Sequence, residues 1–225
     1  MVMNKGQLEV IAGCMFSGKT EELIRRLERV RIARGAILLF KPTIDDRYST
    51  TAVMTHYGRE FAAHLLAPGE ETMETLEQAV GAAAMEEAAV VAFDEGNFFS
   101  ALLPDLCEAL VERGKRVIVA GLDLTFAGEP FGPMPTLLAL ADRVDKLEAV
   151  CVKCGAPATR SQRLVDGRPA RADGPVIQVG GLGSYEARCR TCHERERLRA
   201  RPNKASRLRT RSRRPARRLA ATTCG

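Results

Sequence analysis

The sequence predicts an α/β protein in which helices cover both faces of a mainly parallel β-sheet. Short apolar runs alternate with helical patterns through residue 150, and this alternation is typical of parallel strands joined by crossover helices. A glycine-rich turn joins the first run to the first helix, and two adjacent acids follow a later run. Paired cysteines after residue 150 predict a second, smaller unit.

Each element of the first unit follows from its local pattern. Apolar runs predict strands at 8–12, 36–40, 61–66, 89–93, 116–121 and 146–150. Leu23, Ile24, Leu27 and Val30 recur at helical spacing, and Gly35 ends that helix. Helical patterns also predict helices over 72–87 and 102–113, and a short helix between the loop at 125–135 and the last strand.

The first turn fits the pattern G-x-x-x-x-G-K-[ST]. It lies between a strand and an amphipathic helix and comprises Gly13, Cys14, Met15, Phe16, Ser17, Gly18, Lys19 and Thr20. The glycines let backbone N–H groups and the helix N-terminus surround a polyanion. Lys19 would then contact the outer phosphates, and the Thr20 hydroxyl would bind Mg²⁺. The first unit is therefore predicted to be of the P-loop NTPase type.

An acidic pair, Asp94 and Glu95, ends the apolar run at 89–93. At the carboxyl edge of a parallel sheet such acids lie in the crevice where ligands bind. Asp94 suits the acid that holds Mg²⁺, directly or through water, and Glu95 suits a base for a hydroxyl or a water. A solvated loop or a helix cap is the alternative for an isolated acidic pair, but the upstream P-loop favours the functional interpretation.

Two further loops contain candidate residues. Arg47 follows the second strand and could neutralise a transferring phosphoryl group, although a surface turn explains this segment equally well. Phe126 and Phe131 flank Gly128 and Pro130. They could line a pocket for a flat ring, or they could anchor their loop in the core.

The second unit contains C-x₂-C, 34 residues and a second C-x₂-C. This spacing predicts a tetrahedral Zn²⁺ site built from Cys151, Cys154, Cys189 and Cys192. Four thiolates leave no open position for substrate, so we expect a stabilising role. A pair of disulfides is the alternative, and His193 is an alternative ligand to Cys192. Closing the intervening chain on a metal could hold the segment up to Tyr185 over a neighbouring crevice as a lid.

Charge and composition divide the chain into residues 1–148, 149–197 and 198–225. Residues 199–225 contain ten Lys or Arg and no acid, whereas the preceding residues carry 24 basic and 28 acidic groups. This basic tail should be disordered; arginines can contact nucleic acid, but we expect a solvated extension. The chain begins without a secretory signal and has no uninterrupted apolar run of about 18 residues. We therefore expect a cytoplasmic protein with no membrane partner.

The motifs together resemble those of the type II thymidine kinase family. The similarity runs in order over residues 6–195. It rests on G-x-M-F-S-G-K-T at 13–20, D-x-R-Y at 45–48, D-E-G-x-F-F at 94–99, L-D-x-T-F at 122–126, P-F-G at 130–132, G-G-x-x-x-Y at 180–185 and the two C-x-x-C pairs.

The resemblance implies transfer of the γ-phosphoryl group of ATP to the 5′-hydroxyl of thymidine, which gives dTMP for nucleotide salvage; deoxyuridine is a possible second acceptor. It makes Glu95 the general base and places Arg47 and Arg163 near the phosphates. ATP binding is implied for residues 13–20 and for Asp94, Glu95, Gly96 and Asn97. Nucleoside binding is implied for Met15, Phe98, Leu122, Phe126, Ser161, Val176, Ile177, Gln178, Val179, Gly180 and Tyr185.

The resemblance also implies a homotetramer that dTTP inhibits at the acceptor site. Three positions depart from the family pattern: Asn97 where Gln is usual, Ser161 where Thr is common, and Cys14 where Pro often occurs. The shorter amide of Asn97 and the lost methyl group at Ser161 could loosen contacts with the nucleoside. A zinc-ribbon ATPase that depends on nucleic acid is the alternative function. The short chain and the acidic body favour the kinase, so we expect no nucleic-acid partner.

Overall fold

The computed structural model describes residues 6–43, 52–54, 60–171, 174–176 and 184–194. Within these ranges, six parallel strands form the central sheet in the order β5-β2-β6-β7-β1-β8. The strands are β1 (Gln7–Gly13), β2 (Ala36–Pro42), β5 (His64–Leu66), β6 (Ala88–Phe93), β7 (Arg116–Gly121) and β8 (Arg143–Leu147).

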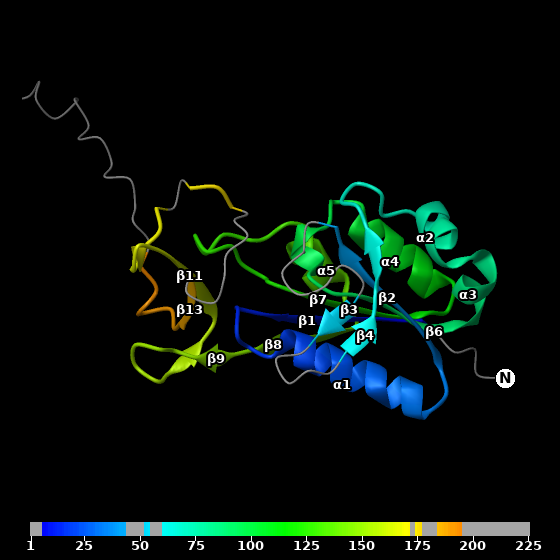
Figure 1. The fold of residues 1–225 in the computed structure, drawn as a ribbon, viewed down its shortest axis with the longest axis horizontal. Helices are drawn as coiled ribbons and strands as arrows, with labels where there is room; N and C mark the ends of the chain where they lie inside the picture. The colour runs from blue at the N-terminus through cyan, green and yellow to red at the C-terminus, as the bar shows by residue number, and fades with distance from the viewer. Residues whose placement is uncertain (1–5, 44–51, 55–59, 172–173, 177–183, 195–225) are drawn as a thin grey trace, which may run out of the picture.

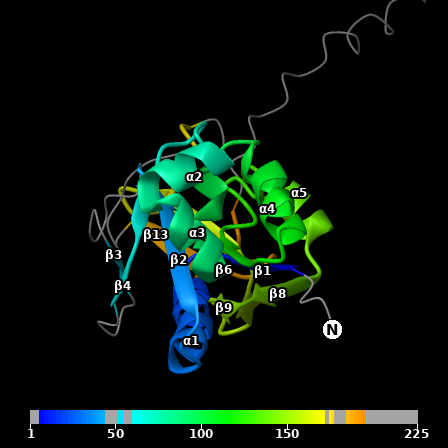
Figure 2. The same ribbon diagram turned by 90° about the vertical axis from the view of Figure 1, so that its right-hand side faces the viewer.

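Helices cover both faces of this sheet, as the sequence predicts. One face packs against α1 (Lys19–Ile32), whose Leu23, Ile24 and Leu27 join a cluster with inward residues of β1, β2, β6 and β7. The other face packs against α2 (Met73–Val80), α3 (Ala82–Glu87), α4 (Leu103–Glu112) and α5 (Met134–Leu140). Figure 2 shows α1 and the pair α4 and α5 on opposite sides of the sheet. Because alternate residues of a strand point to opposite faces, the apolar strands supply both clusters.

Three expected elements differ from those observed. The expected helix over 72–87 is interrupted at Gly81, whose φ of 88° and ψ of 144° no α-helix accommodates. The strand expected at 61–66 is two strands: β4 (Glu60–Ala62) pairs with β3 (Ala52–Met54), whereas β5 joins the central sheet. The strand expected at 146–150 is also two strands: β8 begins earlier and ends at Leu147, and Ala149–Val150 form a separate strand, β9.

A small antiparallel unit lies beyond the carboxyl ends of the central strands (Figure 1). It contains β9 (Ala149–Val150), β10 (Pro157–Ala158), β11 (Arg160–Val165), β12 (Arg168–Pro169) and β13 (Tyr185–Arg188). Strand β11 pairs with β12 and β13, and β9 pairs with β10. Of the helices that the structure describes, none has the length and apolar character that crossing a bilayer requires.

A buried ionic cluster joins α1 to the sheet. The Arg26 guanidinium lies 2.6 Å from Glu9, 2.6 Å from Asp145 and 2.9 Å from Glu22. Hydrogen bonds from Arg25 and Arg26 lower the pKa of Glu22 to about 2, against the opposing effect of burial. A carboxylate with a depressed pKa stabilises the fold above its unfolded pKa, and that contribution disappears as the pH falls toward the folded pKa.

We therefore predict that Glu22→Gln destabilises the protein most at pH values above about 4.5. The difference in unfolding free energy between wild type and variant should shrink as the pH is lowered toward 2, where about half of wild-type Glu22 is neutral in the folded protein. Urea denaturation at a series of pH values measures it. A difference that stays constant from pH 6 to pH 2 would show that the ion pairs do not stabilise the native state.

Candidate active site

The P-loop lies between β1 and α1 and is bent by close internal contacts. A Cβ atom on Gly13 would lie 2.6 Å from the Leu147 carbonyl oxygen and 2.7 Å from Ser17 Oγ, so no larger residue fits there. Gly18 has a left-handed φ of 83° and directly precedes the helix. Ser17 Oγ and Lys19 Nζ donate hydrogen bonds to the Cys14 carbonyl, at 2.8 and 3.0 Å. The first N–H groups of α1 have no partner within the helix, and they border a tight loop that is suited to bind phosphate.

The acidic pair follows β6 at the same edge of the sheet. Asp94 is buried, and its Oδ1 accepts a hydrogen bond from the Glu95 N–H at 3.0 Å. Glu95 has a left-handed backbone, with φ 51° and ψ 41°. A non-glycine residue pays an energetic cost for this conformation, and such strain is concentrated at functional sites. The turn thus places two adjacent carboxylates at the carboxyl edge of the sheet, and Glu95 carries the left-handed backbone.

The short helix η1 (Gly96–Phe98) directly follows the acidic pair and contacts β7. Asn97 is buried, and its Oδ1 accepts a hydrogen bond from the Leu122 N–H at 2.8 Å. The Phe98 ring lies edge-on to the Phe131 ring, with centroids 5.5 Å apart. Asn97 therefore fixes the Leu122 backbone, and the adjacent Phe98 packs its ring against Phe131.

The small antiparallel unit contacts the P-loop directly. Ser161 Oγ, on β11, accepts a hydrogen bond from the Met15 N–H at 3.0 Å. The Cys14 thiol donates to the Ala158 carbonyl at 3.2 Å, and burial raises the pKa of this thiol. The structure thus brings Met15 and Ser161 together, although 146 residues separate them.

Two other residues expected at the site, Arg163 on β11 and Phe126, contact each other. The guanidinium carbon of Arg163 lies 3.6 Å from the centroid of the buried Phe126 ring, a cation–π contact. Arg163 also donates from Nη1 to the Pro175 carbonyl at 2.6 Å and faces Tyr185 across the β11–β13 pair. Val176 is exposed. The remaining expected residues, Arg47, Ile177, Gln178, Val179 and Gly180, lie outside the described residues.

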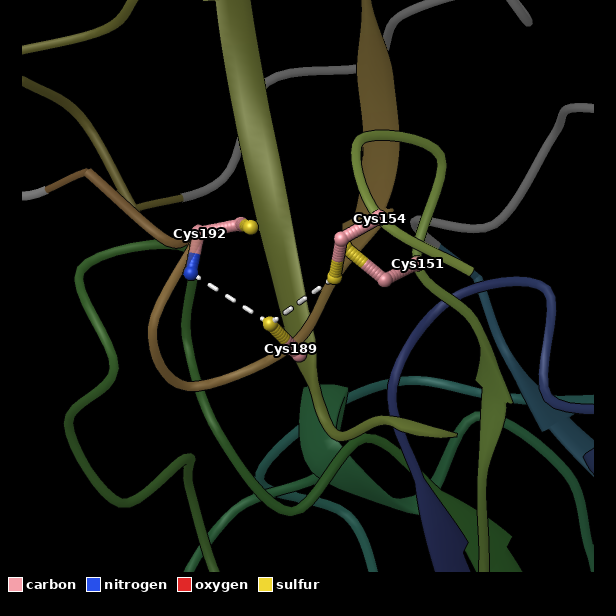
Figure 3. A group of neighbouring side chains, drawn as sticks. All are labelled: Cys151, Cys154, Cys189 and Cys192. Atoms are coloured by element: carbon pink, nitrogen blue, oxygen red, sulfur yellow. Dashed lines mark hydrogen bonds between the residues drawn. The ribbon is translucent and has the colours of Figure 1, made fainter. Parts of the chain in front are cut away.

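The four predicted metal ligands converge in the small unit (Figure 3). The Sγ atoms of Cys151, Cys154, Cys189 and Cys192 all lie within 4.8 Å of one another. Those of Cys154 and Cys189 are 3.7 Å apart, far longer than a disulfide bond. A tetrahedral site with Zn–S bonds of about 2.3 Å requires sulfur atoms about 3.8 Å apart. The thiol cluster therefore fits Zn²⁺, and four sulfur ligands leave no position for substrate.

Several contacts at the site had no signal in the sequence. Lys146 Nζ on β8 lies 2.7 Å from Oδ2 of the buried Asp123. Asp123 belongs to the segment L-D-x-T-F and could have been singled out there, whereas nothing near Lys146 indicates a partner. Gln162 Oε1 accepts from the Glu194 N–H at 2.8 Å. His193, an alternative zinc ligand by sequence, instead lies 2.9 Å from the Phe126 carbonyl through Nε2.

Comparisons with known proteins identify the family. The family model described as thymidine kinase matches residues 6–193. The chain belongs to the thymidine kinase family. The thymidine kinase of Chloroflexus aurantiacus is 54% identical over 192 residues, which cover 84% of this chain and 95% of that protein. That of Halobacterium salinarum is 48% identical over 192 residues, covering 85% and 96%.

The thymidine kinase match includes the P-loop, the acidic pair and all four clustered cysteines. The family assignment therefore applies to both units and does not favour an unrelated zinc-ribbon ATPase. Among solved structures, the genome packaging NTPase B204 from Sulfolobus turreted icosahedral virus 2 in complex with ATP-gammaS aligns with a TM-score of 0.42 at 15% identity. It covers 64% of this chain and 75% of that one, a similarity too weak to inform function.

We predict that the purified protein contains about one equivalent of zinc per chain. Cys189→Ser should lose most of it, because three thiolates bind more weakly than four. Cys107→Ser, which removes a thiol of α4 outside the cluster, is the control and should retain the metal. Elemental analysis after gel filtration measures the content. Full zinc occupancy in Cys189→Ser would refute the four-cysteine site.

Proposed function

We propose that this chain transfers the γ-phosphoryl group of ATP to the 5′-hydroxyl of thymidine, giving dTMP and ADP. The observation that carries the proposal is the meeting of a P-loop, an acidic pair and an aromatic wall at one sheet edge, in a chain that belongs to the thymidine kinase family. The P-loop alone indicates only a nucleotide. The family assignment supplies the acceptor.

The phosphate-binding part is residues 13–20. The backbone N–H groups of the loop and of the first turn of α1 would hold the phosphates, and Lys19 would move its ammonium from the Cys14 carbonyl to their oxygens. The Thr20 hydroxyl and the Asp94 carboxylate would hold Mg²⁺, which, when bound, neutralises charge on the phosphate oxygens. Asp94 suits this role because it is buried, and the Glu95 N–H orients its Oδ1.

Glu95 is the proposed general base. Phosphoryl transfer requires the acceptor oxygen to lose its proton as the P–O bond forms, and a carboxylate within hydrogen-bond reach of the hydroxyl accepts it. Glu95 directly follows the proposed Mg²⁺ ligand, so a base and the phosphates would occupy the same crevice. Its left-handed backbone supports this role, because the strain fixes where the side chain departs from the turn.

The nucleoside is proposed to bind between the crevice and the small unit. Met15, Leu122 and Ser161 would lie near the thymine methyl group, with the Phe98 and Phe126 rings beside the nucleoside. The contact between Met15 and Ser161 supports this placement, because it brings the P-loop against β11. Arg163 would act as a nearby cation, together with Arg47. Residues 176–180 and Tyr185 would form the lid.

Several wider properties belong to the same proposal. Residues 1–148 would form the kinase domain, 149–197 the zinc-binding lid domain and 198–225 a basic tail. Zinc would stabilise the lid, because the cysteines link its ends. We also propose a cytoplasmic homotetramer inhibited by dTTP, on the strength of the family resemblance.

Glu95→Gln should lower kcat by at least about 100-fold, because the amide cannot accept the proton. The Michaelis constant for ATP should change little, since Glu95 is not proposed to hold the phosphates through its carboxylate. Glu112→Gln, which makes the same change in α4 away from the site, is the matched control and should retain wild-type turnover. Steady-state formation of dTMP from ATP, Mg²⁺ and thymidine measures both.

Wild-type turnover in Glu95→Gln would refute its role as the base. Addition of single-stranded DNA or RNA without nucleoside tests the rival function in the same assay. ATP hydrolysis that nucleic acid stimulates, without any phosphorylated nucleoside, would replace the kinase proposal with the ATPase.

A further inference from the structure

His193 connects the cysteine cluster to a loop of the central fold. Its Nε2 lies 2.9 Å from the Phe126 carbonyl oxygen, 67 residues away in the sequence. A carbonyl oxygen only accepts hydrogen bonds, so Nε2 carries the proton and donates it. His193 directly follows Cys192, and its own N–H donates to the Cys189 carbonyl at 3.0 Å. The imidazole therefore extends from the second cysteine turn to the loop that contains Phe126.

The second cysteine turn is itself fixed on both sides of His193. Gln162 accepts from the Glu194 N–H at 2.8 Å and donates to the Glu194 carbonyl at 3.2 Å. Arg188 Nη1 donates to the Cys192 carbonyl at 3.1 Å. Gln162 and Arg188 are both buried, so these hydrogen bonds are shielded from water. The backbone of His193 is thus anchored before its side chain reaches Phe126.

The loop that His193 contacts is short and internally bonded. The Thr125 N–H donates to the Glu129 carbonyl, and the Gly128 N–H donates to the Thr125 carbonyl, both at 2.8 Å. At the apex of this loop the Phe126 ring lies against the Arg163 guanidinium, which is also buried. A shift of the Phe126 carbonyl would rotate the whole turn and separate the ring from Arg163.

We infer that His193 is a positioning residue, which holds the Phe126 carbonyl so that the Phe126 ring keeps its place on the wall of the nucleoside pocket. The binding of a nucleoside in this pocket rests on the proposed function. The contact between His193 and Phe126 is observed in the structure and does not depend on that function. In this role His193 positions the Phe126 loop and is not one of the four thiol ligands that fit the metal. Its effect should therefore appear in the Phe126 loop and in acceptor binding, with ATP binding and zinc content unchanged.

Three substitutions at His193 test this role. His193→Phe keeps a planar ring but removes the donor, His193→Ala removes both, and His193→Gln restores an N–H near the position of Nε2. Hydrogen–deuterium exchange of the free protein compares the peptide over 122–131 with the P-loop peptide over 8–20. We expect faster exchange over 122–131 in the Phe and Ala variants, partial recovery in the Gln variant, and no change over 8–20.

Kinetics and metal analysis complete the test. The Michaelis constant for thymidine should rise about three- to tenfold in the Phe and Ala variants, the cost of one hydrogen bond, while that for ATP stays within about twofold. Zinc content should equal that of wild type. Unchanged exchange over 122–131, equal losses in all three variants, or loss of zinc would each overturn the inference. Wild-type protein that does not phosphorylate thymidine would refute the proposed function instead, and the exchange measurement would still decide the role of His193.

Discussion

The site depends on one constraint: parallel strands deliver their carboxyl ends to a single edge of the sheet. Strands β6, β7 and β1 are neighbours in the order of the sheet. Asp94 and Leu122 directly follow β6 and β7, and Gly13 is the last residue of β1, so the three lie at adjacent strand ends although they are distant in the sequence. Each of these residues therefore lies at the shared edge of the sheet, directly at the end of its own strand. The pairing of the backbone therefore places the P-loop, the acidic pair and Leu122 at the same edge of the sheet.

Two local sequence patterns, continuous apolar runs and apolar residues at helical spacing, predicted most of this fold. Buried strands such as β1 and β6 are short, nearly continuous apolar runs, and α1 repeats its apolar residues at helical spacing, so each pattern favours one type of element. The prediction from apolar runs was wrong where one run contributes to two different sheets. Ala63 lies between β4 and β5, where the chain passes from one sheet to another, and periodicity carries no information about the pairing partner. Strand β8 is an edge strand with exposed Arg143 and Val144, so its apolar signal is weak.

The candidate site likewise contains residues that the sequence predicted and contacts that it did not predict. The P-loop, Asp94 and the four cysteines were predictable because each belongs to a local pattern whose spacing the chemistry dictates. The contacts of Ser161 with Met15, and of His193 with Phe126, were not, since they join segments 146 and 67 residues apart through single hydrogen bonds. Such contacts depend on how the small unit docks on the carboxyl edge. They bring the small unit against the P-loop and against the loop that contains Phe126.

The central claim is that the phosphate held at residues 13–20 moves to a nucleoside hydroxyl. Phosphorus-31 NMR of wild-type protein with ATP, Mg²⁺ and thymidine follows that phosphate directly. The structure and the family assignment predict that a 5′-nucleoside monophosphate resonance grows in step with that of ADP, and that neither grows when thymidine is omitted. Growth of ADP with inorganic phosphate alone, whether or not thymidine is present, would contradict the claim.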